Sequence, residues 1–214
     1  MAKLNVAPTK SNLLSLRKQL AFAEEGYDLL EQKRQILIFE LMSRLARADE
    51  AERRAAAALA SAQAALREAT LDIGSEALDR AALGVQFDHR VEIADQHLMG
   101  LRIPRVTVQV AAFVPQFGLG GTSANTDVAQ RRFLESLPRL AELAELENAV
   151  LRLARELRKT QRRCNALSKN FLPAYRATIG YITGTLEERE RESFILFKMI
   201  RDRLAQPPEA AASP

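Results

Sequence analysis

Apolar residues recur in alternating steps of three and four from Leu13 to Leu41, the repeat of a helix that pairs with another helix. The positions, which we call the N-terminal seam, are Leu13, Leu16, Leu20, Ala23, Tyr27, Leu30, Arg34, Leu37 and Leu41, with Arg34 as the one polar member. Such a stripe returns to the same helix face and lies along a partner helix. The helix is predicted to begin after Pro8, with Thr9 or Ser11 as its N-cap.

Beyond residue 45 the pattern becomes rich in alanine, as in RAAAALASAQAALREAT at 54–70. Alanine is the strongest helix former, so the helix is predicted to continue with smaller side chains. No Gly or Pro occurs between Gly26 and Gly74. We therefore predict one helix of roughly 60 residues and about 90 Å.

The middle of the chain changes from a helical to a strand pattern. Within LRIPRVTVQVAAFV at 101–114, Val106, Val108 and Val110 alternate with other residues, as in a β-strand. Val91 and Ile93 would supply an antiparallel partner strand, which predicts a short β-hairpin. The segment PQFGLGGTSANTD at 115–127 is typical of a mobile loop.

A second helix is predicted to start with Asp127 as its cap and Gln130 three residues later, and Pro138 is expected to kink its first part. The C-terminal seam that follows consists of Leu146, Val150, Leu153, Leu157, Thr160, Cys164, Leu167, Phe171, Ala174, Thr178 and Tyr181. Pro173 predicts a further kink. Two seams in one chain satisfy each other most simply by antiparallel pairing, with Cys164 expected opposite residues 38–52.

The predicted fold class is all-α dominated, with a long antiparallel two-helix coiled coil from the N- and C-terminal segments. A small central module would contain the β-hairpin and short helix. The boundaries that follow are 1–75 for the N-terminal shaft helix, 76–126 for the central module, 127–204 for the C-terminal shaft helix and 205–214 for a disordered tail.

Composition excludes some classes of protein but does not identify a function. The net charge of +4 and pI near 9.5 describe a mildly basic chain, and the single cysteine, Cys164, suits a reducing compartment such as the cytoplasm. The N-terminus lacks the pattern of a standard export signal, and no window is apolar enough for a membrane span. We expect neither export by such a signal nor membrane insertion.

No residue pattern predicts catalysis, a cofactor or a metal site. The glycine run GLGGTS at 118–123 has no Lys after its last glycine, so a linker is favoured over a phosphate loop. His89 and His97, the only histidines, have no ligand constellation around them. Cys164 falls on the C-terminal seam, where it is expected to act as a small buried apolar residue.

Two sets of residues are predicted to contact partners. The basic residues are Arg152, Arg155, Arg158, Arg162 and Arg163, with Lys159, Lys169 and Arg176 nearby and Glu156 as the single acid among them. They suit a solvated flank of a coiled coil, a nucleic-acid surface or a face that meets acidic protein surfaces.

The second set lies near the C-terminus, where FILFKMI at 194–200 is apolar nearly all round, as ILIFELM at 36–42 also is. A two-helix pair covers one stripe only, so Phe194, Phe197, Met199 and Ile200 are expected to contact another protein. Oligomerisation of the chain through this end is the alternative.

Three separated blocks resemble the D subunit of the V/A-type rotary ATPases. They are PTKSNLLSLRKQLAFAEEGYDLLEQKRQILIFEL, HLMGLRIPRV and LRKTQRRCNALSKNFLPAYRATIGYITGTLEERERESFILFKMI, in that order, and the resemblance covers about residues 5–204. The resemblance implies a central rotor shaft that transmits torque. Its terminal helices would enter a ring of alternating catalytic A and non-catalytic B subunits, with the small F subunit packed on the shaft and a funnel-shaped subunit below.

The resemblance also implies that ATP is hydrolysed or synthesised between A and B, so this chain would be a non-catalytic subunit of an ion-transporting complex. It would be cytoplasmic and peripheral to the membrane, without direct insertion. The sequence leaves two alternatives open: a coiled-coil adaptor or scaffold that does not rotate, and a basic nucleic-acid-binding rod. With the resemblance, no nucleic-acid partner is expected.

Overall fold

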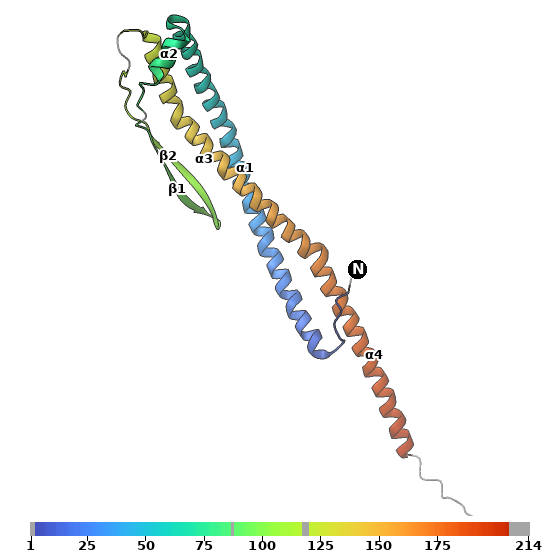
Figure 1. The fold of residues 1–214 in the computed structure, drawn as a ribbon. Coiled ribbons are helices and arrows are strands. Elements are labelled where there is room, and N and C mark those ends of the chain that lie inside the picture. The colour runs from blue at the N-terminus through green and yellow to red at the C-terminus, as the bar shows by residue number, and fades with distance from the viewer. Residues whose placement is uncertain (1–2, 87, 117–119, 206–214) are drawn as a thin grey trace, which may run out of the picture. The chain divides into compact units, whose positions relative to one another are not determined.

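A computed structural model describes residues 3–86, 88–116 and 120–205 (Figure 1). Its elements are α1 (Lys10–Ile73), α2 (Ser75–Ala82), β1 (Arg90–Leu98), β2 (Leu101–Gln109), α3 (Ala124–Ala166), the π-helical turn η1 (Leu167–Phe171) and α4 (Leu172–Ala205). The predicted class, mainly helical with a central β-hairpin, is confirmed. Part of the expected loop (117–119) and nearly all of the expected tail (206–214) lie outside the described residues.

The chain forms two compact units. One consists of Met1–Arg34 and Lys159–Pro214, and the other of Gln35–Arg158. Helices α1 and α3 each contribute residues to both units, because each helix runs through a unit boundary without interruption.

Helix α1 begins and ends where local sequence signals place it. The backbone N–H of Asn12 donates to the Thr9 hydroxyl at 3.2 Å, so Thr9 is the N-cap. The helix has 64 residues, which corresponds to about 96 Å. It stops before Gly74, whose φ of 79° lies in the left-handed region that glycine tolerates best.

In the unit that contains both termini, α1 and the C-terminal helices run antiparallel. Lys10 pairs with Glu190 at 2.8 Å, and Glu24 pairs with Arg176 at 2.7 Å. The partner's residue number falls as the α1 number rises, as an antiparallel arrangement requires. Each of these pairs is exposed and contributes little stability. The pairs therefore show the register of the two helices but do little to stabilise it.

The other unit repeats the antiparallel arrangement with α1 and α3. Arg54 pairs with Glu142 at 3.2 Å, and the Asn125 amide donates to the Asp72 carboxylate at 2.7 Å. The buried residues between the helices include the alanines predicted to slim the helix, namely Ala48, Ala51, Ala55, Ala58, Ala62 and Ala69. Each small side chain buries little apolar area, so the stability of the helix pair depends on many successive layers of alanine.

The seams match the buried stripe until the π-helical turn. All N-terminal seam positions are buried or half-buried, and so are the C-terminal seam positions from Leu146 to Leu167. After η1, however, Phe171 and Tyr181 are exposed, whereas Leu172 and Ile182 are buried. The second half of the predicted seam is therefore displaced by one residue at these two positions.

Pro173 gives the physical reason for the displacement. Proline has no N–H to donate to the carbonyl of Lys169, and its ring crowds that carbonyl in an α-helix. The five residues Leu167–Phe171 form a π-helical turn instead, which fits one extra residue into the helix. The inserted residue accounts for the burial of Leu172 in place of Phe171. Further along α4 the predicted Thr178 is buried, and Ile182 follows it by a step of four.

The central hairpin has the two predicted strands and a two-residue turn, but β2 ends at Gln109, so the predicted Val110 lies just beyond it. Val91 pairs with Val108 and Ile93 with Val106 in an antiparallel ladder. Met99 and Gly100 connect the strands with φ of 51° and 79°, as a type I′ turn requires. Figure 1 shows the hairpin beside α3.

The predicted cap of the second helix is wrong. Helix α3 starts at Ala124, so Asp127 lies within its first turn. The side-chain oxygens Oδ1 of Asp127 and Oε1 of Gln130 are buried and have no hydrogen-bond partner among the described residues. Instead, the Thr126 hydroxyl accepts a hydrogen bond from the backbone N–H of Ser123 at 3.4 Å. Helix α3 also continues through Pro138.

Candidate partner-binding surfaces

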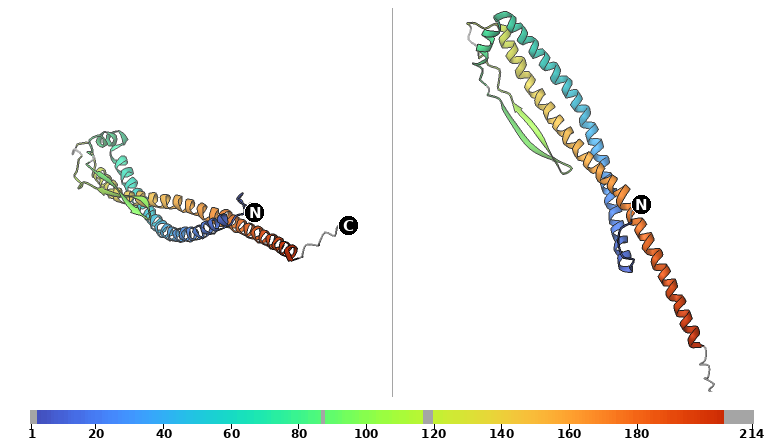
Figure 2. Two further views of the ribbon diagram at one scale, coloured as in Figure 1. Left: turned by 90° about the horizontal axis from the view of Figure 1, so that it is seen from below. Right: turned by 45° about the vertical axis from the view of Figure 1, so that its right-hand side comes forward.

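Helix α4 continues past the start of α1, as both views in Figure 2 show. Because Lys10, the first residue of α1, pairs with Glu190, the α4 residues that follow have no antiparallel partner from α1. We call the apolar part of this segment the apolar end, and its members are Phe194, Ile195, Leu196, Phe197, Met199, Ile200 and Leu204. It includes the four apolar residues predicted to contact a partner.

The apolar end is open to solvent on all sides. Phe194 is 74% exposed and Phe197 68%, and every other member is also exposed. Full burial of one such side chain is worth about 1.5–3 kcal/mol, so a partner that covers several of them gains substantial binding energy. A contiguous apolar surface of this kind marks an interaction site.

The predicted basic residues are not equivalent. Four of them are exposed on α3, namely Arg155, Arg158, Arg162 and Arg163. Arg152 is half-buried, and its guanidinium donates a hydrogen bond to the backbone carbonyl of Arg102 in β2. Arg152 therefore attaches the hairpin to α3, a role that the sequence did not predict.

The basic and apolar sets do not form a single site. Arg163 and Phe194 are 31 positions apart in the helical run through α3, η1 and α4, which corresponds to about 45 Å. A partner of ordinary domain size would contact one set or the other. We therefore treat the exposed α3 arginines and the apolar end as separate surfaces.

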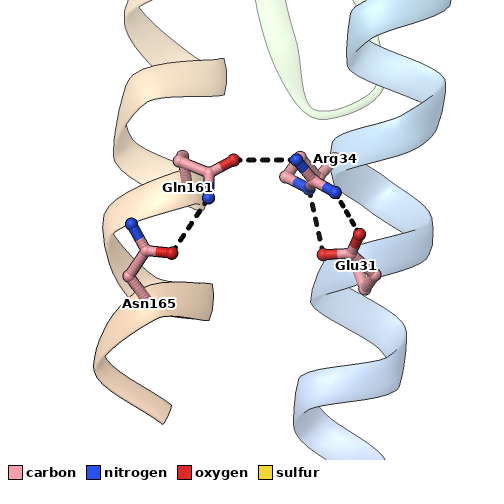
Figure 3. A network of polar contacts seen from close by, with 4 residues as sticks. All are labelled: Glu31, Arg34, Gln161 and Asn165. Carbon is pink, nitrogen blue, oxygen red and sulfur yellow. Dashed lines mark hydrogen bonds and ion pairs between the residues drawn. The ribbon is translucent and has the colours of Figure 1, made fainter. Parts of the chain in front are cut away.

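The polar member of the N-terminal seam is part of a hydrogen-bonded group (Figure 3). Arg34 forms a two-pronged contact with Glu31 on α1, with Nε at 2.9 Å from the Glu31 carboxylate. It also donates to the Gln161 side chain on α3 at 3.0 Å, and Gln161 donates to Asn165 at 3.0 Å. The sequence indicated the polar slot but not its partners across the helix pair.

The buried thiol of Cys164 lies near two members of this group, Glu31 and Arg34. Burial is the largest cause that raises the pKa of Cys164, and the nearby Glu31 carboxylate adds to it. The hydrogen bond from Arg34 lowers the pKa of Glu31. Cys164 thus lies beside Glu31 and Arg34, and the expectation of residues 38–52 opposite it is wrong, because the seams alone do not define the register.

Replacing Arg34 with Met is expected to lower the free energy of unfolding more than a matched control does, because Gln161 on α3 and Glu31 on α1 each lose a hydrogen-bond partner. The matched control is Arg44→Met, whose pair with Glu40 at 3.4 Å lies within one helix and should contribute about 0.5 kcal/mol or less. Urea unfolding at neutral pH measures both variants.

The pH dependence of the Arg34 effect has a definite sign. The lowered pKa of Glu31 stabilises the fold at pH values above the ordinary carboxyl pKa, and this part is lost as acidification protonates Glu31. The difference between the parent and Arg34→Met should therefore shrink at low pH. Equal destabilisation by Arg34→Met and Arg44→Met would contradict a special role for the Arg34 group.

The described residues contain no group of three or more His, Cys, Asp and Glu side chains that would hold a metal ion. The Nδ1 atom of His89 accepts a hydrogen bond from the backbone N–H of Ala111 at 3.3 Å, so its observed contact is structural. Among the helices described, none has a stretch long and apolar enough to cross a membrane. What the geometry offers is surfaces for other proteins.

Known proteins resemble the chain over nearly its full length. The family model that describes the D subunit of ATP synthase matches residues 12–202. The V-type ATP synthase D subunit of Thermotoga neapolitana is 34% identical, over 95% of this chain and 100% of that protein. A V-type ATP synthase D subunit of Treponema pallidum is 39% identical over 94% and 96%, and the A-type ATP synthase D subunit of Methanosphaera stadtmanae is 37% identical over 93% and 94%.

Proposed function

The chain belongs to the family of ATP synthase D subunits, and on that premise we propose that it is the central rotor shaft of a V/A-type ATP synthase. The shaft transmits torque between the catalytic A/B head and the membrane ring that translocates ions. The observation that carries the proposal is the apolar end of α4, a helical segment without a partner from α1 and with exposed apolar side chains all round.

A shaft has to resist twisting and present different faces to the sites around it. Paired antiparallel helices supply stiffness, because each helix is bonded along its own length and the seams lock the two together. Two helices also have a noncircular cross-section. Rotation of such a shaft would therefore offer a different surface to each of several otherwise equivalent catalytic sites.

The two candidate surfaces would serve different parts of this mechanism. The apolar end would turn inside an apolar sleeve of the head, where contacts without direction do not favour one fixed angle. The exposed Arg155, Arg158, Arg162 and Arg163 would meet acidic residues of surrounding subunits, and such contacts depend on the angle of the shaft. Rotation would thereby be linked to the closing of individual catalytic sites.

The remaining partners follow from membership of the D-subunit family. The F subunit would pack on the helix pair, and the funnel-shaped subunit of the membrane ring would bind the opposite end of the shaft from the head. The chain itself would be a non-catalytic subunit, cytoplasmic and peripheral to the membrane, with ATP bound between A and B. Its basic residues would then bind protein and not nucleic acid.

The test is reconstitution of the purified chain with the A and B subunits of its own organism, with and without the F subunit. Native mass spectrometry and ATP hydrolysis are measured on the same samples. We expect one copy of the chain per A/B head and an altered hydrolysis rate. If no complex forms under any nucleotide condition, the chain is an adaptor or scaffold and the rotor proposal is wrong.

A further inference from the structure

The two-residue turn determines which cross-strand pairs of the hairpin are hydrogen-bonded to each other. Leu98 and Leu101 flank the two-residue turn and exchange both ladder hydrogen bonds, and such pairs then alternate with pairs that do not. The backbone groups of the non-bonded pairs point away from the ladder. On β1 these outward-facing residues are Val91, Ile93, Asp95 and His97, and on β2 they are Arg102, Pro104, Val106 and Val108.

The outer edge of β2 is protected by its own sequence and by α3. The carbonyl of Arg102 accepts the hydrogen bond from Arg152, and the N–H of Val106 donates to the Glu145 carboxylate at 2.8 Å. Pro104 between them has no N–H at all. These are common devices by which proteins prevent an edge strand from pairing further.

The outer edge of β1 has no such protection. Within the described residues, the outward-facing N–H groups of β1 make no hydrogen bond, and residues 90–97 are all exposed. Val91 is 58% exposed and Ile93 70%, both on the same face of the strand. The strand pairs over nine consecutive residues, with no bulge or proline to interrupt its edge.

We propose that the outer edge of β1 binds an extended segment of another subunit of the same ATP synthase, which adds a third strand to the sheet. The added strand would pair with the outward N–H and C=O groups of Val91, Ile93, Asp95 and His97. Its side chains would be apolar and β-branched opposite Val91 and Ile93, and cationic opposite Asp95. The inference rests on the proposed membership of a multi-subunit assembly and not on rotation.

A second copy of this chain fits the edge poorly. If two β1 strands paired antiparallel with full overlap, the centre of symmetry would lie at Ala94. Ile93 of each copy would then face Asp95 of the other, and Val91 would face His97. Apolar side chains opposite charged or polar ones lose the cross-strand contacts that stabilise a sheet, so the pattern favours a different sequence as the third strand.

Residue-resolved hydrogen exchange tests the proposal on the full chain, first alone and then assembled with the other subunits. The outward amides of Val91, Ile93, Asp95 and His97 should exchange at least about tenfold more slowly after assembly, because each gains a hydrogen bond. The amides between them are already bonded in the β1–β2 ladder and should change much less. Protection at alternate residues is specific to strand addition, whereas simple coverage of the hairpin slows neighbours alike.

A matched pair of variants tests the backbone contribution. Ile93→Pro removes an outward N–H but no ladder hydrogen bond, as Pro104 does on β2, while Ile93→Ala shortens the side chain and keeps the N–H. The proline variant should bind the remaining subunits at least about threefold more weakly than the alanine variant. Exchange of the ladder amides in the free variant shows whether the hairpin is still folded.

The outcomes separate this inference from the rotor proposal. If the chain assembles but its outward β1 amides exchange as in the free chain, strand addition is wrong and the rotor proposal stands. Slowing of neighbouring amides without alternation overturns strand addition in the same way. Failure of the chain to assemble with any of the subunits overturns both.

Discussion

Ending the chain after Ser193, which removes the apolar end, is expected to leave the antiparallel helix pair folded and to weaken its association with the A/B head by about a hundredfold or more. The removed segment lies beyond Glu190, so the pairing contacts of α1 with Arg176 and Glu190 remain. Phe194, Phe197 and Met199 would each lose about 1.5–3 kcal/mol of burial on binding. Hydrolysis by the head should return toward its rate without the chain.

Single substitutions show which residues cause the weaker association with the A/B head. Phe197→Ser should weaken association by about tenfold, whereas Phe22→Ser, which changes a similarly exposed ring on α1, should have little effect. Circular dichroism of the free variants measures helix content and separates loss of folding from loss of binding. Equal weakening by both variants, or a truncated chain that still alters hydrolysis, contradicts the role of the apolar end.

Local features of the fold were predictable from the sequence. Thr9 is the cap of α1 and Gly74 follows its end, since capping and left-handed glycine depend on a few neighbouring residues. The two strands of the hairpin follow from β-branched residues in alternation, although the pairing of Val91 with Val108 and Ile93 with Val106 was not predicted. The exposed apolar end was also predictable, because its residues are apolar nearly all round and a two-helix seam covers only one side.

The register between distant segments was not predictable in the same way. The seams show that the helices pair, but an antiparallel pair can slide by a heptad and keep its apolar stripe matched. In the register that the structure has, Cys164 lies beside Glu31 and Arg34. Arg152 illustrates a similar limit, since its bond to the Arg102 carbonyl depends on where the hairpin lies.

Burial in α4 predicts a large difference between two neighbouring residues. Ile182→Ala should lower the free energy of unfolding by about 2–4 kcal/mol, because Ile182 is 0% exposed and its truncation leaves a cavity. Tyr181→Ala should cost about 1 kcal/mol or less, because Tyr181 is 48% exposed. Its ring contact with Lys3, at 4.2 Å from Nζ, is of the kind that contributes little at the surface.

A strict alternation of four and three makes the opposite prediction, since the step of four from Ala174 to Thr178 would be followed by a step of three to Tyr181. The structure instead continues from the buried Thr178 by a step of four to Ile182. Urea unfolding of the two variants measures the difference as a shift of the midpoint at unchanged slope. A larger loss from Tyr181→Ala would mean that Tyr181, and not Ile182, lies on the buried side of α4. The prediction therefore tests which face of α4 is buried in the segment that leads to the apolar end.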